Sequence, residues 1–180
     1  ADDHRGSTQA HLRGVLPRRS GRLRSAGPDG DARPHAAAGN HGAPAVDGGL
    51  PRTDLACLGS GTRVNLAGLP RTPTIVNVWA QWCEPCREEA AFLREGLAEL
   101  DGVSFVGINY NDPKPDWAVE FAGLVGWLYP HVVDQDKELR VPLRVAGIPT
   151  TLFVTADGAI AGVHAGPLES TAQLKELAAE

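Results

Sequence analysis

The segment from Thr74 to Leu100 constrains the fold of this 180-residue chain more than any other part. Its first seven residues, TIVNVWA, are almost all apolar or β-forming, which predicts a strand buried on both faces. Beyond Arg87 apolar residues recur at helical spacing, at Ala90, Leu93, Leu97 and Leu100. Two cysteines, Cys83 and Cys86, therefore stand where a strand passes into a helix.

The start of a helix suits a reactive sulfur, because the first backbone N–H groups have no partner in the helix and the dipole is positive there. A thiolate is stabilised at such a place, which lowers the thiol pKa and makes the sulfur nucleophilic near neutral pH. Cys-x-x-Cys alone is also half of a zinc site. The strand, Trp82, Pro85 before Cys86 and the following helix together favour a redox-active pair.

Composition divides the chain near residue 52. Residues 1–52 contain no aromatic residue, Ile, Cys, Lys or Glu, and carry a net charge of +3, whereas residues 53–180 carry −8. Such a segment cannot bury enough apolar surface to offset the entropy of ordering it. We therefore expect a disordered or linker segment over 1–52 and one domain over 53–180.

Within the domain, the pattern predicts alternating strands and helices. Short strands are expected near 55–58 and 64–66, strands at 74–80, 103–108, 131–133, 151–155 and 159–164, and helices after Cys86, from 112 to 128, near 137–143 and after Ser170. Asp157-Gly158 predicts a hairpin. The fold class is therefore α/β: a mixed β-sheet flanked by helices, with an N-terminal β-hairpin cap and an inserted helix.

This order and several motifs resemble the thioredoxin fold, and within it the TlpA/ResA-like family of extracytoplasmic thiol-disulfide oxidoreductases. The resemblance covers roughly residues 53–180. It depends on VNL at 64–66, VNVWA at 76–80, WCEPCR at 82–87, Glu89, the helix near Trp117, and GIPT at 147–150. One departure is Ala91, where members of the family usually have a proline that kinks the helix.

The resemblance implies roles for the GIPT segment. Pro149 is expected to be a cis-proline that faces the cysteines, and the backbone of Ile148 is expected to pair with a substrate peptide. Thr150, together with Trp82, Glu84 and Pro85 beside the cysteines, completes the expected substrate-binding set.

The predicted reaction begins with attack of the Cys83 thiolate on a substrate disulfide, and Cys86 then resolves the mixed disulfide. Cys86 lies a turn further into the helix and should be shielded, so its deprotonation needs a base. Asn77 occupies a position where thioredoxin-like sequences often have Asp, and it cannot titrate. Glu89, three residues after Cys86, is the candidate proton acceptor, although the helix dipole alone also favours Glu there.

Glu84 lies between the cysteines, where its charge opposes stabilisation of the thiolate. We therefore predict a reduction potential in the reducing half of the known range.

Other groups are expected to be structural. Cys57 is interpreted as a small buried hydrophobe, with a redox relay as the alternative. His131 and His164 lack the spacing typical of zinc ligands. Trp82 should shape the surface that receives a partner, whereas Trp79, Trp117 and Trp127 are expected in the core.

The sequence therefore predicts an enzyme that reduces or exchanges disulfides in client proteins; the resemblance includes cytochrome c maturation among its implications. The alternative is a thioredoxin-fold metal carrier or thiol-dependent binding protein without turnover. A peroxidase is disfavoured, because Gln81-Trp82 supplies no Thr or Ser before the attacking cysteine. We expect no cofactor, no nucleic acid and a monomer. The expected location is the cell envelope, and any membrane anchor is expected in a segment before Ala1. The expected electron donor is a thiol-disulfide protein, for which a membrane-bound form is one alternative.

Overall fold

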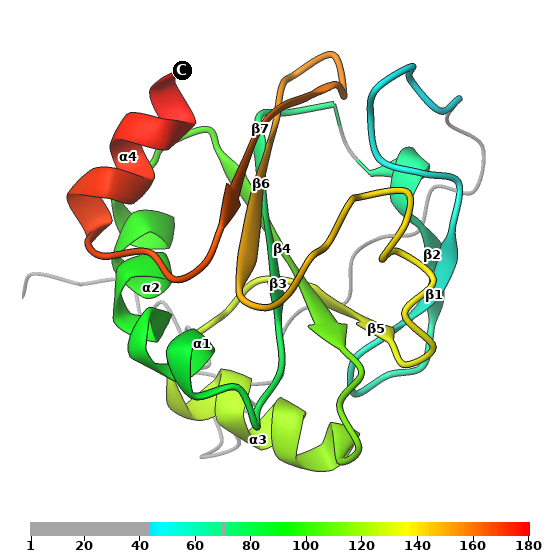
Figure 1. Cartoon of the computed structure of the whole chain (residues 1–180), viewed down its shortest axis with the longest axis vertical. Coiled ribbons are helices and arrows are strands. Elements are labelled where there is room, and N and C mark those ends of the chain that lie inside the picture. Colours follow the sequence, from blue (N-terminus) through cyan, green and yellow to red (C-terminus); the bar gives the residue numbers. More distant parts are fainter. Residues whose placement is uncertain (1–43, 70) are drawn as a thin grey trace, which may run out of the picture. The chain divides into compact units, whose positions relative to one another are not determined.

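The computed structural model describes residues 44–69 and 71–180 (Figure 1). The predicted division at residue 52 stays a prediction, because most of the proposed linker lies outside the described residues. Just before that position, Leu50 is buried, Gly49 forms a β-bridge with Ala159, and Ile160 N donates to Gly48 O at 2.9 Å.

Seven strands of the described residues form one sheet. They are β1 (Asp54–Cys57), β2 (Arg63–Asn65), β3 (Thr74–Trp79), β4 (Ser104–Tyr110), β5 (His131–Asp134), β6 (Thr150–Val154) and β7 (Ile160–Ala165). The helices are α1 (Glu84–Glu88), α2 (Ala90–Glu99), α3 (Pro115–Leu124) and α4 (Thr171–Ala179), with a 3-10 turn η1 at Leu66–Gly68. Among the described residues, no helix is long and apolar enough to cross a membrane.

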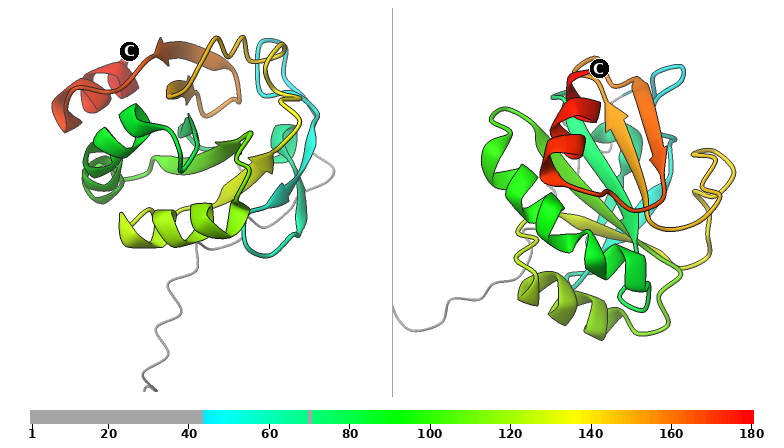
Figure 2. Two further views of the ribbon diagram at one scale, coloured as in Figure 1. Left: turned by 60° about the horizontal axis from the view of Figure 1, so that its bottom comes forward. Right: turned by 60° about the vertical axis from the view of Figure 1, so that its left-hand side comes forward.

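The strands are ordered β2-β1-β5-β4-β3-β6-β7, and β3, β4 and β5 are parallel, whereas the other pairs are antiparallel (Figures 1 and 2). This arrangement confirms the predicted mixed sheet and thioredoxin-like fold. The N-terminal hairpin of β1 and β2 extends the same sheet through β5 rather than standing apart from it.

The α-helices of the described part of the chain all contribute to, or pack against, the core on one face of the sheet. This face carries the side chains of Ile75 and Trp79, which cluster with Leu93 of α2, Phe121 of α3 and Leu174 of α4. The opposite face carries a second core, made by Val76, Val78 and residues of β4 and β6 together with the hairpin and the segment after β5. Cys83 and Cys86 belong to the first core, so the site is built on the helix-covered face.

The helix predicted near 137–143 is wrong, since this segment forms turns. The Asp134 carboxylate accepts the N–H groups of Glu138 and Leu139 at 2.8 and 3.0 Å, and Lys137 adopts a positive φ of 59°. The positive φ favours a turn over a continuous helix. Leu139 and Leu143 of this segment are nevertheless buried in the second core.

The active-site helix breaks between α1 and α2 at Glu89, although Ala91 replaces the proline expected there. The buried Glu89 carboxylate binds groups on β3 and before α4, which fixes the chain at the break.

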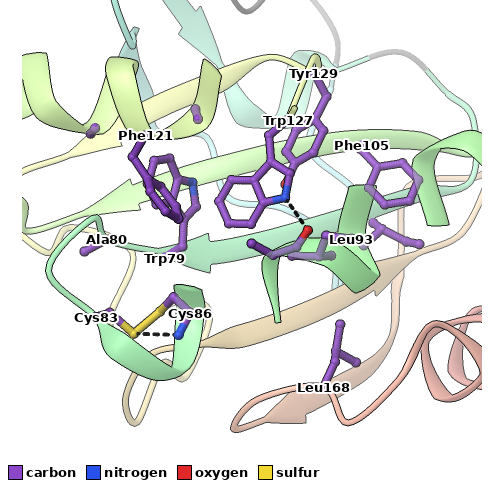
Figure 3. Close-up of a cluster of buried hydrophobic side chains, with 14 of the residues drawn as sticks. Trp79, Ala80, Cys83, Cys86, Leu93, Phe105, Phe121, Trp127, Tyr129 and Leu168 are labelled. Carbon is purple, nitrogen blue, oxygen red and sulfur yellow. Dashed lines mark hydrogen bonds between the residues drawn. A yellow bond between two sulfur atoms is a disulfide. The ribbon is translucent and has the colours of Figure 1, made fainter. Parts of the chain in front are cut away.

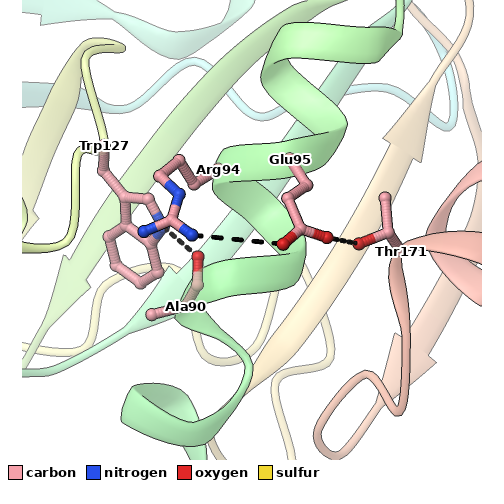
Figure 4. A network of polar contacts seen from close by, with 5 residues as sticks. All are labelled: Ala90, Arg94, Glu95, Trp127 and Thr171. Carbon is pink, nitrogen blue, oxygen red and sulfur yellow. Dashed lines mark hydrogen bonds and ion pairs between the residues drawn. The ribbon is translucent and has the colours of Figure 1, made fainter.

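Gly96 allows close packing between α2 and α4. A Cβ at Gly96 would lie 2.5 Å from Leu174 Cδ2, so glycine lets α2 approach α4. At the same contact, Glu95 accepts a hydrogen bond from the Thr171 hydroxyl (Figure 4). Elsewhere on α2, Arg94 Nη2 lies 4.0 Å from Glu95 Oε1, and the Trp127 indole donates to Ala90 O.

Three tryptophans were predicted in the core, and two are there. Trp79 and Trp127 are fully buried, with ring centroids 5.0 Å apart (Figure 3). The prediction for Trp117 is wrong, because its side chain is 53% exposed. Lys114 Nζ lies over the Trp117 ring, 3.5 Å from the ring centroid, in a cation–π contact.

Candidate active site

Cys83 and Cys86 form a disulfide at the start of α1, beside the buried aromatic cluster (Figure 3). Cys83 is the N-cap residue, and its sulfur accepts a hydrogen bond from Cys86 N at 3.3 Å. This N–H group points at the sulfur and would stabilise a thiolate there. Because α1 has only five residues, its dipole is small. The hydrogen bond from Cys86 N is therefore the firmer source of stabilisation for a Cys83 thiolate.

The two sulfur-bearing residues differ in their access to solvent. Cys83 is 4% exposed and Cys86 is fully buried. Cys83 borders an open groove of about 370 Å³, whereas Cys86 does not. We call this the active-site groove; it is lined by Trp82, Cys83, Glu84, Pro85, Tyr110, Asn111, Lys137, Gly147 and Ile148.

Bonds from the segment between β4 and α3 hold the loop before Cys83. The half-exposed Trp82 donates from Nε1 to Asn111 O at 3.2 Å, and Gln81 N donates to Asp112 Oδ2 at 2.8 Å. Asp112 is fully buried, and it also accepts from Asn109 Nδ2 at 3.1 Å. Sequence reasoning assigned Asp112 only to the start of a helix, since its contact with Gln81 spans 31 positions.

The segment predicted to face the cysteines contains a cis peptide bond between Ile148 and Pro149. Ile148 lines the active-site groove, whereas Pro149 and Thr150 are buried behind it. The Thr150 hydroxyl donates to Gly147 O at 2.7 Å, so Thr150 shapes the loop from within. Of the predicted substrate-binding residues, the structure therefore places Trp82, Glu84, Pro85 and Ile148 at the groove.

Glu89 is completely buried beneath the break between α1 and α2. Its Oε1 accepts from Asn77 Nδ2 at 3.0 Å, and its Oε2 accepts from Leu168 N at 2.8 Å. Burial raises the pKa of Glu89 from 4.5 to about 7, and the bonds from Leu168 and Asn77 limit the rise. A carboxyl group with this pKa can exchange a proton near neutral pH.

The remaining candidates lie away from the groove lining. Cys57 is buried in the second core. His131 is buried under the helices, where its Nδ1 accepts from Trp79 Nε1 at 3.1 Å and burial lowers its pKa to about 3. His164 lies on the edge strand β7. Within the part of the chain that the structure describes, no three His, Cys, Asp or Glu residues are grouped to hold a metal ion.

Comparison with known families shows to which family the chain belongs. The family profile named Redoxin matches residues 37–179. The chain belongs to the redoxin family.

Named relatives agree with this assignment. The chain is 35% identical over 137 residues to the thiol:disulfide interchange protein DsbE of Pseudomonas fluorescens biotype C, covering 73% of this chain and 72% of that protein. It is 39% identical over 104 residues to the thiol:disulfide interchange protein CycY of Rhizobium leguminosarum bv. viciae, a match that covers 57% of this chain and about half of that protein, 54%.

A solved structure of similar fold is that of a secreted thiol-disulfide isomerase from Corynebacterium glutamicum, at 28% identity and a TM-score of 0.64, covering 72% of this chain and 82% of that one. A second is a secreted Mycobacterium tuberculosis disulfide oxidoreductase homologous to DsbE, at 25% identity and a TM-score of 0.61, covering 71% and 92%. With the paired cysteines, this redoxin protein is a thiol-disulfide oxidoreductase of thioredoxin-like fold.

Proposed function

We propose that Cys83 of this redoxin protein attacks a disulfide in a client protein, and that Cys86 resolves the mixed disulfide. The observation that carries this proposal is the asymmetry of the pair, since Cys83 borders the active-site groove and Cys86 is enclosed behind it. The Cys83 thiolate displaces one client sulfur as a thiolate. The Cys86 thiolate then attacks Cys83 Sγ, which releases the second client thiolate and leaves the disulfide seen here.

Glu89 is the proposed proton acceptor for Cys86. A thiol that is fully shielded resists deprotonation, because burial disfavours the charged form. Glu89 lies three residues further along the chain, in the same buried core, with a pKa of about 7. In this step the Cys86 S–H proton passes to the carboxylate, which leaves a thiolate and a neutral carboxyl group.

A trapping experiment tests the order of attack. The Cys86→Ala variant can form a mixed disulfide but cannot resolve it, so we expect it to accumulate covalent adducts with disulfide-bearing proteins in extracts. Adducts are detected by non-reducing electrophoresis and released by a reductant. The matched Cys83→Ala variant should form at least tenfold fewer adducts, because its remaining sulfur is enclosed. Equal trapping by both variants would contradict the proposed roles.

The proposed clients are proteins with disulfides near their surface, and maturation of c-type cytochromes is one process that the family resemblance implies. Because solved relatives are described as secreted, we propose that this protein acts outside the cytoplasm. Its reductant would be another thiol-disulfide protein, which docks at the same groove because electrons enter and leave through Cys83. The proposed state of the protein is a monomer.

A further inference from the structure

Polar residues occupy one row across the helix-covered face of the sheet. The strand registers place Thr151 of β6 opposite Asn77 of β3, Asn77 opposite Gly107 of β4, and Gly107 opposite His131 of β5. Residues that are opposite each other on neighbouring strands point to the same face. Trp79, two positions after Asn77, belongs to the core beneath the helices, so the row lies beneath the same helices.

Three buried atoms of this row have no hydrogen-bond partner: Asn77 Oδ1, Thr151 Oγ1 and His131 Nε2. The first two belong to residues that lie directly opposite each other in the sheet. Asn77 is 1% exposed and Thr151 is fully buried. The opposite end of the same amide, Asn77 Nδ2, is the group that donates to Glu89. Buried polar atoms are almost always paired. Unpaired atoms on two opposed residues, one of which donates a hydrogen bond to the proposed proton acceptor, therefore call for a functional explanation.

Asn77 Oδ1 and Thr151 Oγ1 complement each other chemically. A threonine hydroxyl donates one hydrogen bond, and an amide oxygen only accepts. Opposed side chains of antiparallel strands have Cβ atoms roughly 4.5–5.5 Å apart. A rotation about the Thr151 Cα–Cβ bond, or one bridging water, therefore joins the Thr151 hydroxyl to Asn77 Oδ1.

We propose that Thr151 is a positioning residue, whose hydroxyl donates to Asn77 Oδ1 and completes a hydrogen-bond chain that ends on the Glu89 carboxylate. Both donors of this chain point toward the negative charge. Charge-assisted bonds are stronger than neutral ones, and successive bonds polarise one another. The chain therefore favours the ionised form of Glu89, which is the form able to accept the Cys86 proton. No proton leaves Thr151 or Asn77.

This inference rests on the proposed role of Glu89. Burial alone would leave the Glu89 carboxyl group largely protonated at neutral pH. A protonated carboxyl group cannot accept another proton from a thiol. The chain from Thr151 offsets part of that burial. The register of β6 with β3 thus allows Thr151, which does not react itself, to affect the protonation of Glu89.

Other titratable groups face the same cluster. They are Cys86 of α1 once it is reduced, Tyr129 before β5, His131 of β5 and His164 of β7, which lies opposite Thr151. Burial and the Glu89 carboxylate raise the pKa of Tyr129, and burial lowers that of His131 to about 3, so both stay neutral near pH 7. A His164→Gln background removes the remaining ring from the experiment.

The test follows the Glu89 carboxyl carbon by NMR as a function of pH in the reduced protein. Thr151→Val keeps the shape of the side chain and removes the hydroxyl, so the midpoint should rise by roughly 0.5–1 pH unit, the equivalent of one hydrogen bond. Thr151→Ser should titrate like the natural protein. Thr74→Val is the matched control, since Thr74 is a buried threonine on the other face of the sheet that donates to Thr72 O.

An unchanged midpoint in folded Thr151→Val would overturn the proposal. If that variant does not fold, NMR of the Thr151 hydroxyl proton in the natural protein decides. A hydrogen-bonded hydroxyl proton should exchange slowly with solvent, and its chemical shift should change with the same midpoint as Glu89. Rapid exchange would contradict the proposed hydrogen bond.

A separate arm, Glu89→Gln, tests the proposed function. If the pH dependence of thiol alkylation is unchanged in that variant, Glu89 is not the proton acceptor, whatever the midpoints in the Thr151 variants show.

Discussion

At the scale of single residues, Glu89 combines a buried carboxyl group with a position between two helices. Its pKa of about 7 in the folded protein compares with 4.5 for an unperturbed group, so the native state binds the proton more tightly than the unfolded state does. The stability that Glu89 contributes is complete below pH 4.5 and is lost as pH rises through about 7. The full loss is on the order of 3 kcal/mol.

We therefore expect Glu89→Gln to gain stability relative to the natural protein between pH 4.5 and pH 8, by about 3 kcal/mol. The measurement is urea unfolding of both oxidised proteins across this range. His131 acts in the opposite sense, because its lowered pKa makes stability fall as pH drops from 6.5 toward 3. His131 is present in both proteins and cancels in the difference, so parallel stability curves would contradict the assigned burial of Glu89.

At the scale of elements, the close contact of β4 and β5 depends on Gly107. A Cβ at this position would lie 1.8 Å from His131 Nδ1, an atom that Trp79 already holds by a hydrogen bond. Gly107→Ala should therefore destabilise the protein by roughly 1–3 kcal/mol, as expected for an overpacked core. Denaturant unfolding measures this change.

Gly162→Ala in β7 is the control, since the nearest atom to its Cβ would be Phe153 Cδ2 at 3.7 Å. Adding His131→Ala to Gly107→Ala should remove the clash, so the two changes should couple in a double-mutant cycle. Strictly additive effects would show that the clash is not the cause.

At the scale of the whole molecule, we expect the charge and length of the helix start to influence the reduction potential of the protein. Thioredoxin lies near about −270 mV and the strongly oxidising DsbA near about −120 mV. The five-residue α1 begins with an acid, Glu84, which limits stabilisation of the Cys83 thiolate. We expect a potential in the reducing half of that range, measured by equilibration with glutathione or dithiothreitol.

Glu84→Gln should raise the potential by roughly 5–20 mV, the size of an exposed charge interaction. A value near −120 mV for the natural protein, or a decrease in the variant, would show that another feature controls the thiolate.

Predictions from the sequence succeeded where one continuous segment carried the information. The strand before the cysteine pair and the helix after it follow from local periodicity. The helix predicted after Ser170 is α4, and the hydroxyl of its N-cap residue Ser170 accepts from Gln173 N at 3.1 Å. The helix expected at 137–143 failed, because Lys137 at its start and Arg144 just after it have positive φ angles of 59° and 52°, which a continuous right-handed helix does not allow.

The sequence by itself determined which residues could do redox chemistry, because two cysteines three positions apart at a helix start are neighbours whatever the rest of the chain does. The tertiary structure decided which groups surround the buried Glu89 carboxyl group, the proposed proton acceptor. Glu89 meets Leu168 across 79 positions, and Asn77 meets Thr151 only through the register of β3 with β6. Such partners are chosen by packing between distant segments, which no local pattern of residues encodes.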